Sequence, residues 1–286
     1  MDAAPDTLVD RFGALAAATT VGSLPAEVVR SVPQRVLDVL GICVRATTLD
    51  TSGAMSGLVL DEGGAEVATG VGLARRVPAR AAAFLNGGLA HSLDYDDTHL
   101  PSILHPSASV VPAALAAGEA AGATGAQVLA AVAVGLEVAV RTGMAGYDPD
   151  ADGGRGQSVY FEHGQHATSI CGALGSAAAA AMLWRPGDAG AVANSIAVAC
   201  SMASGIIEAN RTGGTVKRVH CGLAAHAGLT AAALVARGLT GAPTALEGRF
   251  GFFEAWLRDE WREGPVVDGL GTCLLYTSDA ADDTPC

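Results

Sequence analysis

The stretch ATSICGALGSAAAAAMLW, residues 167–184, decides the fold class because it has no charged side chain and consists mostly of small residues. A second uncharged run of similar composition covers residues 189–207. Each run is long enough to span a bilayer, but Ala, Gly, Ser and Cys far outnumber Leu, Ile and Phe. The two runs therefore predict buried core helices, packed through Ala and Gly contacts, in a protein without a membrane partner.

The overall composition agrees with this interpretation and excludes several kinds of partner. Aromatic residues make up 5% of the 286 residues, which favours closely packed helices over aromatic-rich sheets. The formal net charge of −12 argues against nucleic acid, because binding a phosphate backbone requires a basic surface. The amino terminus lacks the features of a signal peptide. The six cysteines form neither a CxxC pair nor a metal-ligand spacing, so we expect a cytoplasmic protein with reduced thiols.

Capping residues and prolines predict several element boundaries. Thr124-Gly-Ala-Gln127 is a capping box, which predicts a helix that ends near Gly143. Asp188 is expected to cap a helix that extends to about residue 205. The remaining predicted elements are helices that begin at Pro25 and Pro78, a helix over residues 224–236, a strand over residues 66–69 and a loop over residues 146–156.

The most polar segment of the chain is HSLDYDDTHLPSILHPS, residues 91–107, which holds three carboxylates and three imidazoles but no Lys or Arg. Such groups are costly to hold together, since like charges and desolvation move their pKa values. The segment is therefore the first candidate for a proton-transfer site. The alternative is that Asp96 and Asp97 cap a helix and that the histidines are ordinary surface or core residues.

Two further regions carry candidate functional residues. Lys217 is the only lysine in the sequence, and every other Lys or Arg position is arginine. A position that nevertheless keeps lysine indicates that a compact ammonium group is needed there. His163 and His166 lie at the start of a predicted helix, where free N–H groups favour an anion. Alternatively, His166 only caps its helix. His226 lies in an apolar helical pattern and is interpreted as a core residue.

Several of these motifs occur together in one order along the chain. They are Asn86-Gly87, Asp94-Tyr-Asp96-Asp97-Thr98, His105-Pro106-Ser107, Gly135-Leu-Glu137, His166-Ala-Thr168, Lys217-Arg218-Val-His220 and Leu246-Glu-Gly248. In order and spacing they resemble the MmgE/PrpD family, which includes 2-methylcitrate dehydratase, cis-aconitate decarboxylase and iminodisuccinate epimerase.

This resemblance implies an all-α fold in which a large helical domain, here residues 1–270, normally joins a smaller α/β lid domain and forms a homodimer. The lid domain is missing from this sequence. Residues 273–286 leave the family pattern and are interpreted as a non-native read-through tail, which we expect to be disordered. An inactive helical dimerisation fragment is therefore one alternative.

The resemblance also implies a metal-independent lyase that needs no cofactor and acts on a small polycarboxylate through a carbanion or enediolate. We predict 2-methylcitrate dehydratase-like activity, with cis-aconitate decarboxylase-like or iminodisuccinate epimerase-like activity as alternatives. The catalytic residues that the resemblance implies are Asp94, Thr98, His105, His166 and Lys217. We assign substrate binding to His166, Lys217, Arg218 and His220.

The proposed roles follow from the chemistry of a developing negative charge. Asp94 and His105 are assigned to proton transfer, and Thr98 to hydrogen bonding with the substrate or with Asp94. If this segment is helical, Asp94 and Thr98 share one face and Asp96 points elsewhere. A metal-dependent hydrolase is the alternative from another class. Its ligands would be His91, Asp94, Asp97 and either His99 or His105, although a motif such as HExxH is absent from the sequence.

Overall fold

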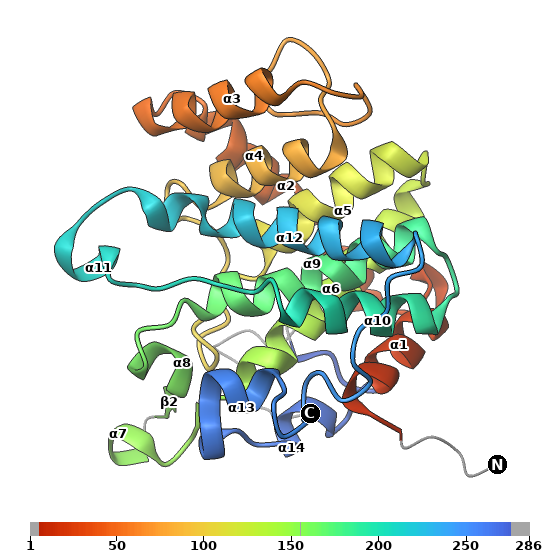
Figure 1. Ribbon diagram of the computed structural model, residues 1–286, viewed down its shortest axis with the longest axis vertical. Helices are drawn as coiled ribbons and strands as arrows, with labels where there is room; N and C mark the ends of the chain where they lie inside the picture. Colours follow the sequence, from red (N-terminus) through yellow and green to blue (C-terminus); the bar gives the residue numbers. More distant parts are fainter. Residues whose placement is uncertain (1–5, 155, 276–286) are drawn as a thin grey trace.

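The computed structural model describes residues 6–154 and 156–275, and nearly all of its regular secondary structure is helical (Figure 1). The only sheet within these residues pairs two short antiparallel strands, β1 (Tyr147–Asp148) and β2 (Gln157–Ser158). The predicted all-α class of the large domain is confirmed. The longer helices are α1 (Leu8–Ala18), α2 (Ala26–Ala46), α3 (Asp50–Glu62), α4 (Ala79–Ala90), α5 (Ser107–Ala121), α6 (Gly125–Met144), α9 (Ala167–Trp184), α10 (Ala189–Cys200) and α12 (His220–Val235). The shorter helices are η1 (Val21–Ser23), α7 (Ala151–Gly154), α8 (Val159–Glu162), α11 (Ala209–Thr212), η2 (Val216–Val219), α13 (Phe252–Leu257), η3 (Arg258–Glu260) and α14 (Gly264–Val267).

Helix α9 is the centre of the core, as its uncharged sequence predicts. It packs against α5, α6, α10 and α12, and all of its residues except Met182 and Trp184 are buried (Figure 1). Small residues are required at the crossings: a Cβ added at Gly175 would lie 2.3 Å from the carbonyl oxygen of Gly135 on α6. Helices α6 and α9 are both long and apolar enough to cross a membrane, but 78% and 89% of their most apolar windows are buried inside the protein.

Several predicted helix boundaries are confirmed. Thr124 accepts a hydrogen bond from the backbone N–H of Gln127, and the capping box begins α6, which ends one residue beyond Gly143. Helix α2 begins directly after Pro25 and α4 directly after Pro78. Asp188 caps α10 by accepting from the N–H of Ala191.

Other predicted boundaries are wrong, and tertiary contacts explain the largest error. Helix α10 ends at Cys200 because the following residues pair with the segment before α9. The backbone N–H of His166 donates to the carbonyl of Gly205 at 3.1 Å, and that of Ile207 donates to Gly164 at 3.0 Å. Helix α12 begins at His220, four residues earlier than expected, because η2 leads directly into it.

Three local predictions also need correction. The predicted strand over residues 66–69 makes only an isolated bridge between Ala68 and Val77. The predicted loop over residues 146–156 contains β1 and α7, and its Arg155 lies outside the described residues. Cys43, Cys171, Cys200 and Cys221 are free thiols as expected, whereas Cys273 is disulfide-bonded.

A buried ion pair fixes the C-terminal part of the described chain to α6. Arg141 and Glu137 are fully buried and bind each other one helical turn apart. The guanidinium of Arg141 donates to the carbonyls of Pro265, Val266, Asp268 and Cys273, and a carboxylate oxygen of Glu137 accepts from the N–H of Leu275 at 2.9 Å. Residues 273–275 of the predicted tail are thus in contact with α6, and residues 276–286 lie outside the described residues.

Candidate active site

Four histidine rings form a row where four core helices begin or end. The ring centroids are 5.2 Å apart from His105 to His91, 5.5 Å from His91 to His166, and 4.9 Å from His166 to His220. His91 follows the last residue of α4, His105 lies just before α5, His166 precedes the first residue of α9, and His220 is the first residue of α12. The row therefore joins residues that are far apart in the sequence.

Glycine contacts between α4 and α12 bring this row together. A Cβ added at Gly222 would lie 2.2 Å from the carbonyl oxygen of Phe84, and one at Gly87 would lie 2.7 Å from that of Cys221. Only glycine allows the two backbones to approach so closely. The C-terminal end of α4, which carries His91, consequently lies beside the first turn of α12.

His91 and Asp96 form a buried pair that the sequence analysis missed as part of the site. His91 Nδ1 lies 2.7 Å from a carboxylate oxygen of Asp96, and both side chains are fully buried. Burial alone would lower the pKa of His91, but the neighbouring Cys221 and Asp96 outweigh it and raise that pKa to about 10. His91 is therefore an imidazolium at neutral pH, and Asp96, which was expected to point away, is its counterion.

His105 lies next to this pair and is held by backbone groups. Its Nδ1 is 3.1 Å from the carbonyl oxygen of Asp97, 3.3 Å from that of Asp96 and 3.2 Å from the hydroxyl of Thr98. Carbonyl oxygens only accept hydrogen bonds, so Nδ1 carries a proton and Nε2 is the nitrogen left to exchange a proton with a substrate. The side chain is 19% exposed, which leaves the ring accessible to a substrate.

His166 and His220 share a hydrogen bond between their Nδ1 atoms, which are 2.8 Å apart. Burial, reinforced by the charge of His91, lowers the pKa of His166 to about 2, and burial also lowers the pKa of His220. Both rings are therefore neutral, and one Nδ1–H donates to the other Nδ1. The side chain of His166 makes no hydrogen bond to the first turn of α9, so the interpretation of His166 as only a helix cap is wrong.

The other two histidines of these regions lie outside the row. His163 contacts Glu260, with 3.2 Å between its Nε2 and a carboxylate oxygen, on a more exposed part of the surface. His226 is half-buried within α12, where burial lowers its pKa, in agreement with its interpretation as a core residue.

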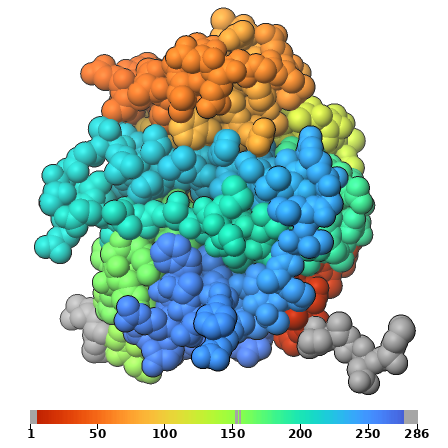
Figure 2. Space-filling model, in the orientation of Figure 1, coloured from red at the N-terminus to blue at the C-terminus, as the bar shows by residue number. Residues whose placement is uncertain are grey.

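Lys217 and Asp94 form a more accessible ion pair beside the histidines. Lys217 lies in η2, after a segment containing α11 that projects from the side of the molecule (Figures 1 and 2). Its Nζ is 2.8 Å from a carboxylate oxygen of Asp94, and the two side chains are 23% and 60% exposed. Partial burial raises the pKa of Asp94, but the hydrogen bond and charge of Lys217 outweigh burial and lower it. The charge of Lys217 also lowers the pKa of His166.

The segment from Asp94 to Thr98 is not helical, which changes two predicted contacts. Asp94 has φ 57, in the left-handed region, and the residues that follow it are extended or bent. Thr98 consequently contacts His105, whereas Asp94 contacts Lys217, so the two do not act from one helical face. Arg218, a predicted substrate-binding residue, donates to the hydroxyl of Thr51 on α3 at 2.8 Å.

The expected ligands of a metal-dependent hydrolase do not converge on one point. Asp97 binds Arg35 and accepts from the backbone N–H of Ser107, the first residue of α5, at 3.1 Å. The alternative that Asp96 and Asp97 cap a helix thus agrees with the contacts of Asp97 but not with those of Asp96, which pairs with His91. His99 pairs with the hydroxyl of Ser102 at 2.7 Å.

A different set of donor atoms, from His91, Asp96 and Cys221, does lie within 4.8 Å of one another. Burial raises the pKa of Cys221, however, and its side chain is hydrogen-bonded to His91, so a metal ion would have to displace this contact. His91 Nδ1 and a carboxylate oxygen of Asp96 are already joined by a hydrogen bond, so a metal ion would have to replace its proton. This set fits an internal ion pair better than a metal site.

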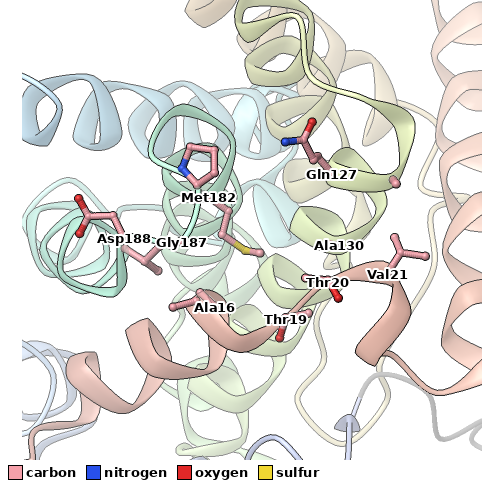
Figure 3. A pocket seen from close by; sticks show the side chains of 13 residues that line it. Ala16, Thr19, Thr20, Val21, Gln127, Ala130, Met182, Gly187 and Asp188 are labelled. Carbon is pink, nitrogen blue, oxygen red and sulfur yellow. The ribbon is translucent and has the colours of Figure 1, made fainter.

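A separate cavity of about 290 Å³ lies between α1, α6 and the turn that joins α9 to α10 (Figure 3). Its lining shares no residue with the histidine row. Its polar side chains already have local partners, since Gln127 belongs to the capping box of α6 and Asp188 caps α10. The cavity is therefore not part of the candidate active site.

Comparison with known proteins identifies the family. Residues 10–263 match the MmgE/PrpD N-terminal domain. The chain is 30% identical to the cis-aconitate decarboxylase of Aspergillus terreus, in a match that covers 71% of this chain and 41% of that protein. It is 31% identical to the cis-aconitate decarboxylase-like protein oryM of Aspergillus oryzae (64% and 37% covered) and 34% identical to the human cis-aconitate decarboxylase (62% and 35% covered). The matches span about two fifths of the length of these curated relatives. Because this family domain matches most of the chain, the chain belongs to the MmgE/PrpD family.

Proposed function

We propose that this chain supplies the catalytic helical domain of a lyase that acts on a small tricarboxylate through a carbanion stabilised by an adjacent carboxylate. The observation that carries this proposal is that His105, whose Nε2 makes none of its backbone contacts, lies in one row with neutral His166 and near the ion pair of Lys217 and Asp94. Such a reaction needs a group that moves a proton and a cation that stabilises the charge formed on the substrate.

Lys217 binds a carboxylate of the substrate in this proposal. Its present partner, Asp94, is 60% exposed and lies on a segment without regular structure, so a substrate carboxylate can take its place at Nζ. Because Asp94 is ionised and paired with Lys217, it occupies the position at Nζ that a substrate carboxylate takes on binding, and it is only a weak base. This role differs from the proton transfer that was first assigned to Asp94.

His105 transfers the proton, and Thr98 holds its ring. Hydrogen bonds from Nδ1 to backbone carbonyls fix the tautomer, so Nε2 accepts the proton and later returns it. His166 stays neutral: its Nδ1 accepts from Nδ1–H of His220, and its Nε2–H donates to a second substrate carboxylate next to the N-terminus of α9, where the helix dipole favours negative charge.

The relatives favour cis-aconitate as the substrate, since the curated matches named above are cis-aconitate decarboxylases or resemble them. In that reaction one C–C bond breaks, CO₂ leaves, the electron pair spreads into the neighbouring carboxylate, and Nε2 of His105 delivers to carbon a proton that it has taken from solvent. The dehydration of 2-methylcitrate predicted from the sequence uses the same groups. A proton is removed next to a carboxylate, and hydroxide leaves with a proton.

The test joins this chain to the C-terminal region of the Aspergillus terreus cis-aconitate decarboxylase, because the matched region covers only part of that protein. The joined protein is incubated separately with cis-aconitate and 2-methylcitrate, and products are measured by chromatography. We expect decarboxylation of cis-aconitate that is abolished by His105→Gln and retained by the control His226→Gln. Equal activity of the His105 variant, or turnover of neither tricarboxylate by a folded protein, contradicts the proposal.

A further inference from the structure

His91 and Asp96 adjoin the two histidines to which the proposed reaction assigns proton transfer and carboxylate binding. The His91 ring lies between those of His105 and His166, at centroid distances of 5.2 and 5.5 Å. One carboxylate oxygen of Asp96 is 2.7 Å from Nδ1 of His91 and 3.8 Å from Nδ1 of His105. Because the side chains of His91 and Asp96 are fully buried, they act on a substrate only through their neighbours.

This pair is costly for the fold to maintain. The second carboxylate oxygen of Asp96 is buried and has no hydrogen-bond partner among the described residues, and His91 Nε2 is buried with only the thiol of Cys221 as a further polar neighbour of the ring. Buried polar atoms without partners destabilise a protein, and apolar residues of similar size would fill the same space at lower cost. The helices around the pair are packed by Ala and Gly and do not need an ion pair to cross. A pair kept at this cost beside a reactive site indicates a role in the chemistry.

We propose that His91 and Asp96 are positioning residues of the lyase reaction, an inference that rests on the proposed function. The His91 ring separates His105 from His166, and its positive charge, held by Asp96, prevents His166 from taking up a proton. His105 is thereby left as the group in the row that transfers protons, and His166 remains a neutral hydrogen-bonding group.

The charges around His166 support this division of roles. His91 faces it from the end of α4, Lys217 from η2, His220 from α12 and His105 from the segment before α5. Each of these groups is a cation or becomes one when protonated, and together with burial they lower the pKa of His166. A positive charge on His166 would meet that of His91 across 5.5 Å, a separation at which like charges repel strongly. A positive charge on His105 would meet His91 across 5.2 Å, but it would also have a carboxylate oxygen of Asp96 3.8 Å from Nδ1 to offset the repulsion.

The first test uses the unaltered 286-residue chain with ¹⁵N-labelled histidine rings. Solid-state NMR does not require a soluble sample and distinguishes protonated from unprotonated ring nitrogens. At about pH 8, below the pKa of His91 near 10, we expect both nitrogens of His91 to be protonated and His166 to retain one unprotonated nitrogen. A neutral His91 ring at this pH overturns the proposal, and no variant is needed to see it.

The second test separates the charge of His91 from its hydrogen bond. His91→Gln keeps a donor for Asp96 but removes the charge, so the pKa of His166 should rise by about 1–3 units. Asp96→Asn should lower the pKa of His91, because it removes one of the groups that raise it, and should change the pKa of His166 in the same direction as His91→Gln. The matched control is His226→Gln, which removes a half-buried histidine outside the row and should leave His166 unchanged. A folded His91→Gln chain with an unchanged His166 pKa refutes the role of the charge.

Activity gives an independent measurement in the joined protein described above. His91→Gln should lower kcat by about 10–100-fold with KM changed less than about twofold, because the substrate is bound but the proton-transfer geometry is disturbed. A normal kcat and pH profile would overturn the proposal. If the joined protein turns over neither tricarboxylate, the proposed function fails. The NMR measurement on His91 and His166 in the unaltered chain tests the protonation states independently of that result.

Discussion

The contact between α4 and α12 provides a test of how the histidine row is built. Gly222→Ala would place a Cβ 2.2 Å from the carbonyl oxygen of Phe84, whereas ordinary contact begins at 3.4 Å, so the backbones must separate by about 1.2 Å. The matched control is Gly41→Ala on α2, where an added Cβ meets nothing within 4 Å. Both glycines lie inside helices, so the gain of about 1 kcal/mol in helix propensity is common to both variants.

The difference in stability between the two variants is therefore the steric cost, which is about 1–3 kcal/mol for overpacking. Urea denaturation followed by circular dichroism measures it. With a slope near 3 kcal/mol per molar, we expect the midpoint of Gly222→Ala to lie about 0.3–1 M below that of Gly41→Ala. Equal midpoints would show that α4 and α12 are not in the tight contact described here. The same substitution should move His91 away from Cys221 and disturb the NMR signals of the row.

Four further outcomes are expected. Lys217→Ala should lower turnover of the joined protein by about 10²–10³-fold, and Lys217→Arg should also be impaired; near-normal kinetics in both variants would reduce Lys217 to a surface cation. Exhaustive chelation and dialysis should leave that turnover intact, and a loss that is reversed by returning one metal ion would contradict this. Stability should decrease on both sides of about pH 6.5. The depressed pKa of His166 makes its contribution fall as pH decreases from 6.5 toward 2, and the raised pKa of His91 makes its contribution fall as pH increases from 6.5 toward 10. Denaturation midpoints from about pH 5 to 9 test this, and His91→Gln should flatten the alkaline side and, by raising the pKa of His166, reduce the loss on the acid side as well. Finally, Glu137→Gln should destabilise the protein by about 3–5 kcal/mol, since it leaves the buried Arg141 without its counterion; a loss below about 1 kcal/mol in urea denaturation would contradict this.

The sequence predicts the core better than the ends of its helices. Residues 167–184 form a buried helix because a run of small uncharged side chains fits only where backbones are close. The Thr124 and Asp188 caps are local hydrogen bonds and are found where predicted. The C-terminal end of α10 was misplaced because residues 205–207 pair with residues 164–166, a contact that no local pattern reveals.

The site shows the same division between local and tertiary information. Sequence motifs identify Asp94, His105 and Lys217 as candidates, and the structure places them in one region. The roles of His91 and Asp96 depend on the turn after α4, where Asp94 takes φ 57 and Asp96 points inward. The high density of acids and histidines in residues 91–107 indicates a site in this segment. Which acid pairs with which histidine depends on the tertiary structure and cannot be read from the sequence. The homodimer, the cytoplasmic location and the choice of substrate stay predictions.

The buried Arg141 has a mechanical consequence. One guanidinium accepts no hydrogen bonds and donates to four carbonyls spread over residues 265–273, while its charge is balanced within α6 by Glu137. A force that pulls on this segment is consequently transmitted to the middle of the core, since several hydrogen bonds must break together before any residue peels away. In a single-molecule pulling experiment, residues 265–275 should therefore yield in one step together with α6, instead of unravelling residue by residue.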